Sequence, residues 1–235
     1  MGLEDELKSE VDGIFRGRWT TRNGTTVPEL SELGLGNDGI YLESTVLYAD
    51  LRESTKLVNA QSLIFAAEVY KAFLHCAYRI IKAESGTITA YDGDRIMAVY
   101  LGDYKNSSAT KTAQKIKFAV TNVVNPSLKK VYDTKDYVVQ HRVGVDTGKL
   151  LVARTTVRGN NDLVWVGPAA NYAAKLAAIH GDFASYISKA VYSMISKEAK
   201  FHSKTGEDMW TPLTWTGPDG TPTAIYGSDI GWVIG

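Results

Sequence analysis

Apolar residues near the start of the chain recur every three or four positions, and a polar stretch follows them. Over residues 3–16 this spacing predicts a short amphipathic helix whose apolar side carries Leu3, Leu7, Val11, Ile14 and Phe15. Residues 17–40 are polar and rich in turn-forming residues, which favours an arm or linker over a second domain. We therefore divide the chain into an N-terminal helix and arm, residues 1–40, and one large domain, residues 41–235.

The large domain alternates between the period-2 pattern of strands and the 3.6-residue pattern of helices. Strands are expected at residues 45–50, 87–91, 94–101, 137–145, 149–153, 163–166, 186–187, 210–215 and 221–225. Helices are expected at residues 56–84, 106–124, 168–180 and 189–195. This order lacks strict βα alternation, so it predicts an α+β fold with a central mixed or antiparallel sheet flanked by helices.

Three turn signals separate the elements in the middle of the chain. Asp92-Gly93 lies between two β runs and is a strong signal for a tight hairpin. Asn125-Pro126 is expected to end the helix at 106–124, and Asp146-Thr147-Gly148 to form a turn between two strands. The domain is therefore expected to contain two internal hairpins before the hairpin at its C-terminal end.

The strand at 45–50 ends in a carboxylate. Asp50 is followed by Arg52 and then by Ser54 and Thr55, which are residue types that cap helix N-termini. Backbone N–H groups at a helix start can hold an anion, so a carboxylate beside them suits a nucleoside triphosphate with its metal. Arg52, Ser54 and Thr55 are thus candidate substrate-binding residues. An Asp that only caps the next helix would give the same pattern.

Asp94 supplies a second carboxylate. It is expected to open the second strand of the Asp92-Gly93 hairpin, and in a shared sheet it can meet Asp50 at one edge. Two carboxylates with little other protein ligation suit a pair of divalent cations, Mg²⁺ or Mn²⁺, bridged by substrate phosphates. A polar residue beside a turn is the simpler alternative for Asp94 alone.

The predicted helix at 168–180 carries a third candidate pair. Asn171 and Lys175 are four residues apart and so share one face of the helix. The alanines around them permit close approach by a ligand or a second subunit. An amide beside a cation can orient a sugar and stabilise a pentavalent phosphorus. The same pair could also be an ordinary solvated surface pair.

The charge and composition of the chain limit the binding partners and the cellular location that we expect. The 26 basic and 26 acidic residues give a formal net charge of zero, which offers no electrostatic basis for binding nucleic acid or a membrane surface. The single cysteine, Cys76, excludes an internal disulfide. No apolar run is long enough to span a bilayer, and the acidic N-terminus does not resemble a signal peptide. We therefore expect a cytoplasmic protein.

Four segments resemble motifs of the class III nucleotidyl cyclase catalytic domain, in the order and spacing of that family. The segments are Leu47–Thr55, Gly86–Tyr100, Arg142–Gly148 and Val166–Leu176. The resemblance covers residues 43–195 and implies a ferredoxin-like cyclase domain. It further implies that Asp50 and Asp94 bind two divalent cations and that Asn171 orients the ribose. Active sites of this family lie at the interface of a dimer, so a homodimer is expected.

Two cationic positions depart from the family pattern. Lys175 stands where the family usually has an arginine, which keeps the charge but loses the bidentate geometry. The family also has a lysine near the chain end that grips the triphosphate, whereas residues 210–235 contain no lysine. Arg154, Arg158 or Arg52 could take its place.

The positions that read the base also depart from the purine cyclases of the family. Ala90 lies four residues before Asp94, and Val164 lies seven before Asn171. Purine cyclases carry polar residues at both positions. Tyr91, beside Ala90, or Tyr48 could fill the pocket and narrow it for a smaller ring. In these respects the chain resembles the pyrimidine cyclases of the Pycsar anti-phage systems.

The resemblance thus implies a homodimeric cyclase that turns a pyrimidine nucleoside triphosphate, UTP before CTP, into a 3′,5′-cyclic second messenger and pyrophosphate. Two alternatives stay open. One is an adenylate or guanylate cyclase that reads its base with other residues. The other is a degenerate cyclase-like module that binds nucleotide or dimerises without catalysis.

Overall fold

The computed structural model describes residues 2–134, 136–155, 163–217 and 220–235. Within these residues one mixed sheet has the order β3-β4-β2-β5-β7-β9-β8, with β1 beside β2 and β6 beside β5. The strands are β1 (Thr20–Asn23), β2 (Asp38–Leu51), β3 (Thr87–Asp92), β4 (Arg95–Tyr100), β5 (His141–Arg154), β6 (Leu163–Val166), β7 (Ser185–Ser188), β8 (Thr211–Thr216) and β9 (Pro222–Ser228). The expected α+β fold with a mixed sheet flanked by helices is confirmed.

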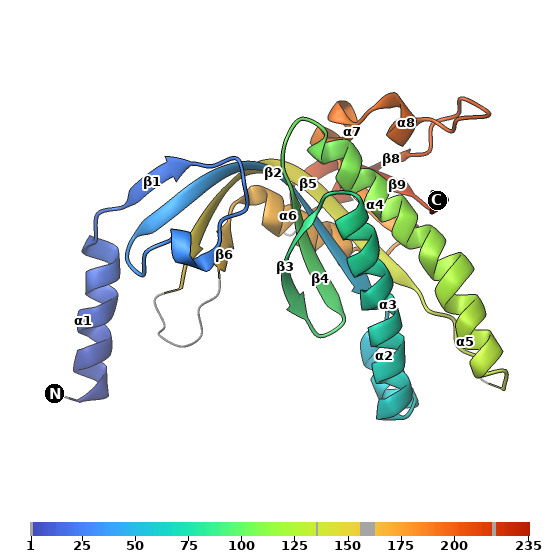
Figure 1. The fold of residues 1–235 in the computed structure, drawn as a ribbon, viewed down its shortest axis with the longest axis horizontal. Coiled ribbons are helices and arrows are strands. Elements are labelled where there is room, and N and C mark those ends of the chain that lie inside the picture. Colours follow the sequence, from blue (N-terminus) through green and yellow to red (C-terminus); the bar gives the residue numbers. More distant parts are fainter. Residues whose placement is uncertain (1, 135, 156–162, 218–219) are drawn as a thin grey trace.

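Helices cover both faces of this sheet (Figure 1). They are α1 (Leu3–Arg16), α2 (Ser54–Ala60), α3 (Leu63–Ala83), α4 (Lys105–Ala119), α5 (Asn125–Val131), α6 (Pro168–Ala177), α7 (Lys189–Met194) and α8 (Lys197–Lys200). A 3₁₀ turn, η1 (Leu30–Glu32), lies in the N-terminal arm, and a π turn, η2 (Val120–Val124), joins α4 to α5.

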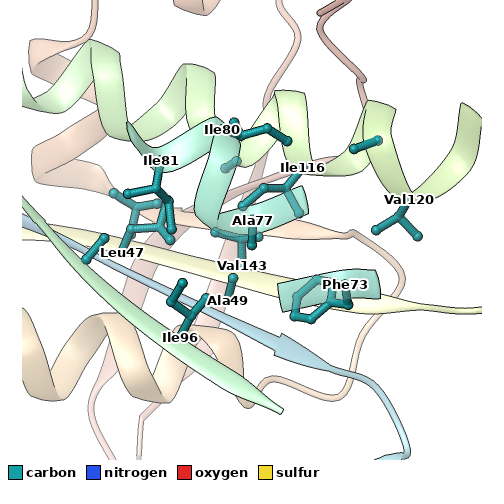
Figure 2. Packing of buried hydrophobic residues seen from close by; sticks show 14 of the residues in the cluster. Leu47, Ala49, Phe73, Ala77, Ile80, Ile81, Ile96, Ile116, Val120 and Val143 are labelled. Carbon is teal, nitrogen blue, oxygen red and sulfur yellow. The ribbon is translucent and has the colours of Figure 1, made fainter. Parts of the chain in front are cut away.

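The alternation of side chains along β2 divides the core in two. Leu47 and Ala49 belong to the large cluster between the sheet and helices α3 and α4, where Phe73 and Ile116 pack (Figure 2). Val46 points the other way and belongs to a smaller cluster under α6. Even-numbered positions of β2 therefore lie on the face that α6 partly covers, and Asp50 is one of them.

Two strands are longer than the sequence pattern predicts. β2 begins at Asp38, inside the segment assigned to the arm, so the expected boundary between residues 40 and 41 falls within a strand. The predicted turn at 146–148 is wrong, because β5 continues through it. The two strands pair without interruption from Gly39 opposite Ala153 to Leu51 opposite His141. Hydrogen bonding to a long neighbour keeps the polar residues of β5 extended.

The predicted helix ends also need correction. The segment expected as one helix over 56–84 is divided between α2 and α3, where Ser62 caps α3 by accepting a hydrogen bond from the Phe65 N–H at 3.3 Å. Asn125-Pro126 does not end the helical segment. Pro126 lies in the first turn of α5, where a missing N–H costs no helical hydrogen bond.

The hairpin between β3 and β4 is shifted by one residue from the prediction. Asp92 is the last residue of β3 and pairs with Arg95, so the two turn residues are Gly93 and Asp94. Gly93 takes the positive φ of 59° that the first position of such a turn requires. The shift places Asp94 at the tip of the turn instead of in a strand.

Helix α1 extends away from the sheet and has no buried residue (Figure 1). Its C-terminal end is held by the Asn37 side-chain amide, which donates to the carbonyl oxygens of Ile14 at 2.8 Å and Gly17 at 2.7 Å. Among the described residues, no helix combines the length and apolar character needed to cross a membrane.

Helix α6 lies very close to β5 at one point. A Cβ atom on Gly144 would come within 2.1 Å of the Ala173 carbonyl oxygen and 2.4 Å of the Ala177 nitrogen. Both atoms belong to the helix backbone, so a side chain here would displace α6 from the sheet.

We expect Gly144→Ala to lower the free energy of unfolding by about 1–3 kcal/mol or more, because the overpacked helix must move. Gly148→Ala is the matched control on the same strand, since its Cβ would lie 3.7 Å from the Ala169 Cβ, an ordinary contact. Urea denaturation of both variants measures the difference. Equal stability of the two would show that α6 is not seated on Gly144.

Candidate active site

Asp50, near the end of β2, is bound by an arginine that the sequence analysis did not single out. Arg95 Nε and Nη2 both donate to Asp50 Oδ2, at 3.1 Å and 2.8 Å. The two side chains are partly buried, with 18% of Asp50 and 36% of Arg95 exposed. Arg95 is the first residue of β4, and its position on the Asp50 face follows from the pairing of β2 with β4.

Asp94 lies beside this ion pair. Burial raises the pKa of Asp50, the two hydrogen bonds from Arg95 lower it, and the nearby negative charge of Asp94 raises it again. The Oδ2 atom of Asp94 is buried and has no hydrogen-bond partner among the described residues. The structure therefore brings the two predicted metal ligands together, with one carboxylate oxygen left unsatisfied.

These oxygens fit a divalent cation. Mg²⁺ and Mn²⁺ prefer carboxylate oxygen ligands, and an unsatisfied buried carboxylate oxygen is a site where a cation would be favourable. Among the described residues, no group of three or more His, Cys, Asp and Glu side chains gathers to form a protein cage for a metal. Two carboxylates alone would leave most of a coordination shell to water and to substrate oxygens.

The predicted anion-binding residues follow directly along the chain. Ser54 and Thr55 are the first two residues of α2, and the N-cap is Glu53, in the left-handed conformation with φ of 58°. No side chain caps this helix. Arg52 is half-buried, and its N–H donates to the Gln140 carbonyl oxygen at 2.9 Å.

A second arginine missed by sequence reasoning lies next to Asp50 on the adjacent strand. Arg142 is the partner of Asp50 in the β2–β5 register and is 2% exposed. Its Nη2 donates to the Gly181 carbonyl oxygen at 2.9 Å, while Nε and Nη1 have no partner among the described residues. Burial lowers its pKa. Its place beside Asp50 depends on strand register, which the sequence pattern left undetermined.

Asn171 and Lys175 are not brought to the aspartates of the same chain. The alanines of α6 that pack on the sheet include Ala173, and two residues in either direction along a helix correspond to a rotation of about 200°. Asn171 and Lys175 are both exposed and lie opposite this buried face. No hydrogen bond or ion pair among the described residues links them to Asp50 or Asp94.

The structure separates the residues expected to read the base. Ala90 and Tyr48 both pair with Met97 of β4, so they lie on the Asp50 face of adjacent strands. Tyr91 pairs with Ile96 and faces the α3 side instead. It is therefore not brought to the Asp50 face.

Val164 and Arg154 lie at the far end of β5. Val164 pairs with Ala153, eleven residues beyond Arg142, which corresponds to about 36 Å along an extended strand. Arg154 Nη1 donates to the Leu33 carbonyl oxygen at 3.4 Å in the same region. Neither residue can reach Asp50 of its own chain. Arg158 lies outside the described residues.

Solved structures share this fold. The guanylyl cyclase Cya2 superimposes with a TM-score of 0.69 over 81% of this chain and 93% of its own, at 16% sequence identity. This likeness shows that the chain has the fold of the class III nucleotidyl cyclase catalytic domain, as the sequence motifs implied.

Curated sequences identify the family. A uridylate cyclase of Xanthomonas perforans is 46% identical over 235 residues, and one of Burkholderia cepacia is 45% identical over 236 residues. Both alignments cover 100% of this chain and of the relative. The chain belongs to the uridylate cyclase family. No protein-family model matches the sequence.

His141 is a buried titratable group beneath the site. It opens β5 opposite Leu51, and its ring lies 6.0 Å from that of Phe73. Burial, with the positive charges of Lys117 and Arg142, lowers the pKa of His141 to about 3. The folded protein therefore keeps this ring neutral at pH values where the unfolded chain protonates it.

We expect the contribution of His141 to the free energy of unfolding to be fully present above pH 6.5. It falls as the pH drops, because only the unfolded state then takes up a proton. Between pH 7.5 and pH 5 the loss amounts to about 2 kcal/mol. His141→Phe should remove this part of the pH dependence, whereas the exposed His75→Gln should keep it. Denaturant unfolding at both pH values tests this, and parallel losses in wild type and His141→Phe would contradict it.

Proposed function

We propose that this protein converts UTP into 3′,5′-cyclic UMP and pyrophosphate. The observation that carries the proposal is the full-length similarity, at 46% identity, to an enzyme named uridylate cyclase. The exposed Ala90 on the Asp50 face supports it, because an alanine offers no hydrogen bond to a purine edge. Tyr48 lies on the same face, two residues before Asp50 on β2, and is the residue we assign to limiting the size of the base.

Asp50 and Asp94 would hold two divalent cations, Mg²⁺ or Mn²⁺, together with the triphosphate. When bound there, the cations would lower the pKa of the ribose 3′-hydroxyl and neutralise phosphate charge. The 3′-oxygen attacks the α-phosphorus in line with the leaving pyrophosphate, so the protein contributes mainly position and charge. Arg142, whose Nε and Nη1 atoms have no partner among the described residues, is the cation we assign to the triphosphate in place of the family's lysine. Arg52 and the start of α2, Ser54 and Thr55, follow Asp50 directly in sequence and would face the same phosphates.

A complete site needs two chains. Asn171 and Lys175 point away from the sheet that carries their own aspartates, so they can serve only a site on a second copy. Each copy carries both halves, and a symmetric homodimer would therefore hold two sites. In it Asn171 orients the ribose, and Lys175 balances charge on the pentavalent phosphorus. Val164, which is 41% exposed, would also reach a base pocket only from the partner.

The catalytic unit in this proposal is residues 41–235 together with the first residues of β2, Asp38–Ile40, and the rest of the helix and arm of residues 1–40 is added to it. The product would serve as a cytoplasmic second messenger in anti-phage defence. Neither nucleic acid nor a membrane is required as a partner.

We expect cyclic UMP to dominate when the protein is given equal UTP, CTP, ATP and GTP with Mn²⁺. An unmatched polar base edge costs about 1–3 kcal/mol, which disfavours each purine by roughly tenfold to a hundredfold. Chromatography of the products measures the outcome. Predominant cyclic AMP or cyclic GMP would refute a pyrimidine cyclase, and predominant cyclic CMP would refute only the choice of UTP.

Asp50→Asn and Lys175→Ala should each lose nearly all activity while staying folded, because each removes a charge and no core volume. Mixing the two inactive proteins should restore activity, since one of the two sites in a heterodimer keeps both an intact Asp50 and an intact Lys175. Each variant mixed with itself is the control. Absence of restored activity, with subunit exchange demonstrated by tagged chains, would place the whole site within one chain.

A further inference from the structure

Arg95 binds Asp50 in an unusual way for an arginine–carboxylate pair. Both donors, Nε and Nη2, are directed at one oxygen, Oδ2, instead of one donor at each oxygen. That oxygen belongs to a carboxylate that sits beside a second one, Asp94, in partly buried surroundings. The guanidinium is the positive charge that reduces the repulsion between the two carboxylates.

A divalent cation at this site would bind the same carboxylate oxygen of Asp50 that Arg95 binds. Oδ2 of Asp50 accepts two hydrogen bonds from Arg95, so a cation ligated by that oxygen would lie close to the guanidinium. Two positive groups cannot share one partly buried oxygen without repulsion. Arg95 is also attracted by Asp92, its partner across the hairpin, and lies near Tyr48. It therefore has anionic and polar surroundings outside the Asp50 contact.

We propose that Arg95 is a positioning residue that competes with the metal for Asp50 and, once displaced, turns to the anionic nucleotide. This role rests on the proposed two-carboxylate metal site. The contact keeps Asp50 in its ligating position before a cation arrives, and it weakens binding of a cation alone. Metal and nucleotide then strengthen each other's binding, because the metal releases the guanidinium that the nucleotide uses.

The first test measures Mn²⁺ binding without nucleotide, by electron paramagnetic resonance of free Mn²⁺. Arg95→Ala should bind Mn²⁺ roughly five- to tenfold more tightly than wild type, the effect of losing a charged hydrogen-bonded competitor. Arg95→Lys, which retains the charge without two aligned donors, should lie between them. Equal or weaker Mn²⁺ binding by Arg95→Ala, or by Arg95→Lys if the alanine variant does not fold, would overturn the competition.

The matched control is Arg22→Ala. Arg22 pairs with Asp38 at 2.9 Å in the N-terminal arm, so this variant removes a similar Arg–Asp contact remote from the site. Its Mn²⁺ affinity should equal that of wild type. Asp50→Asn should bind Mn²⁺ much more weakly; unchanged binding would reject the metal site itself, whichever nucleotide the enzyme uses.

The second test measures the coupling with 3′-deoxy-UTP, which lacks the attacking hydroxyl and cannot cyclise. Mn²⁺ should strengthen its binding by a factor roughly five- to tenfold larger in wild type than in Arg95→Ala. An equal factor in both proteins would overturn the transfer of Arg95 to the nucleotide. The Mn²⁺ measurement alone does not depend on the base, so a failure of the uridine assignment is distinguishable from a failure of this role.

Discussion

The long antiparallel pairing of β2 with β5 determines which side chains can meet at the site. Because directly paired residues lie on the same face of a sheet, Asp50 and Arg142 lie on one side, while Leu51 and His141 lie on the opposite side. A slip of one residue would bury Asp50 under α3 and expose the apolar positions of β2. The two core clusters, one on each face, prevent such a slip, so the packing of the whole sheet fixes the position of one carboxylate.

Asp50 and Asp94 lie close together although their negative charges repel each other. Burial and mutual repulsion both disfavour two negative charges, and Arg95 offsets part of that cost. The one-residue shift of the hairpin contributes as well. Asp94 lies in the turn, beyond the last β3–β4 pair of Asp92 with Arg95, and close to Asp50. The same cluster of charges that makes the metal-free site costly makes a divalent cation favourable there.

The sequence predicted the elements better than their lengths, and the reason is physical. Periodicity marked nearly every helix and strand, but it could not show that residues 38–44 of β2 and 146–148 of β5 are extended, because it is the pairing of β2 with β5 that keeps them so. Asp50 and Asp94 were predicted by position and motif. Arg95 and Arg142 were not, since an arginine beside a strand end is usually solvated, and only the register reveals a carboxylate next to it. Tyr91 lies on the α3 side because consecutive residues of β3 alternate between the faces of the sheet, so Tyr91 and Ala90 cannot share one pocket.

Helix α6 connects the fold to the proposed assembly. Its inward face consists mostly of alanines, which lets its backbone lie against Gly144, and Asn171 and Lys175 lie on the exposed side of the helix. The packing that stabilises the helix therefore also keeps Asn171 and Lys175 on its outward surface. In the proposed homodimer, they act on a nucleotide held by Asp50 of the other chain. Lysine suits this position: a flexible point charge can adjust across a subunit boundary, whereas a bidentate arginine demands a fixed angle.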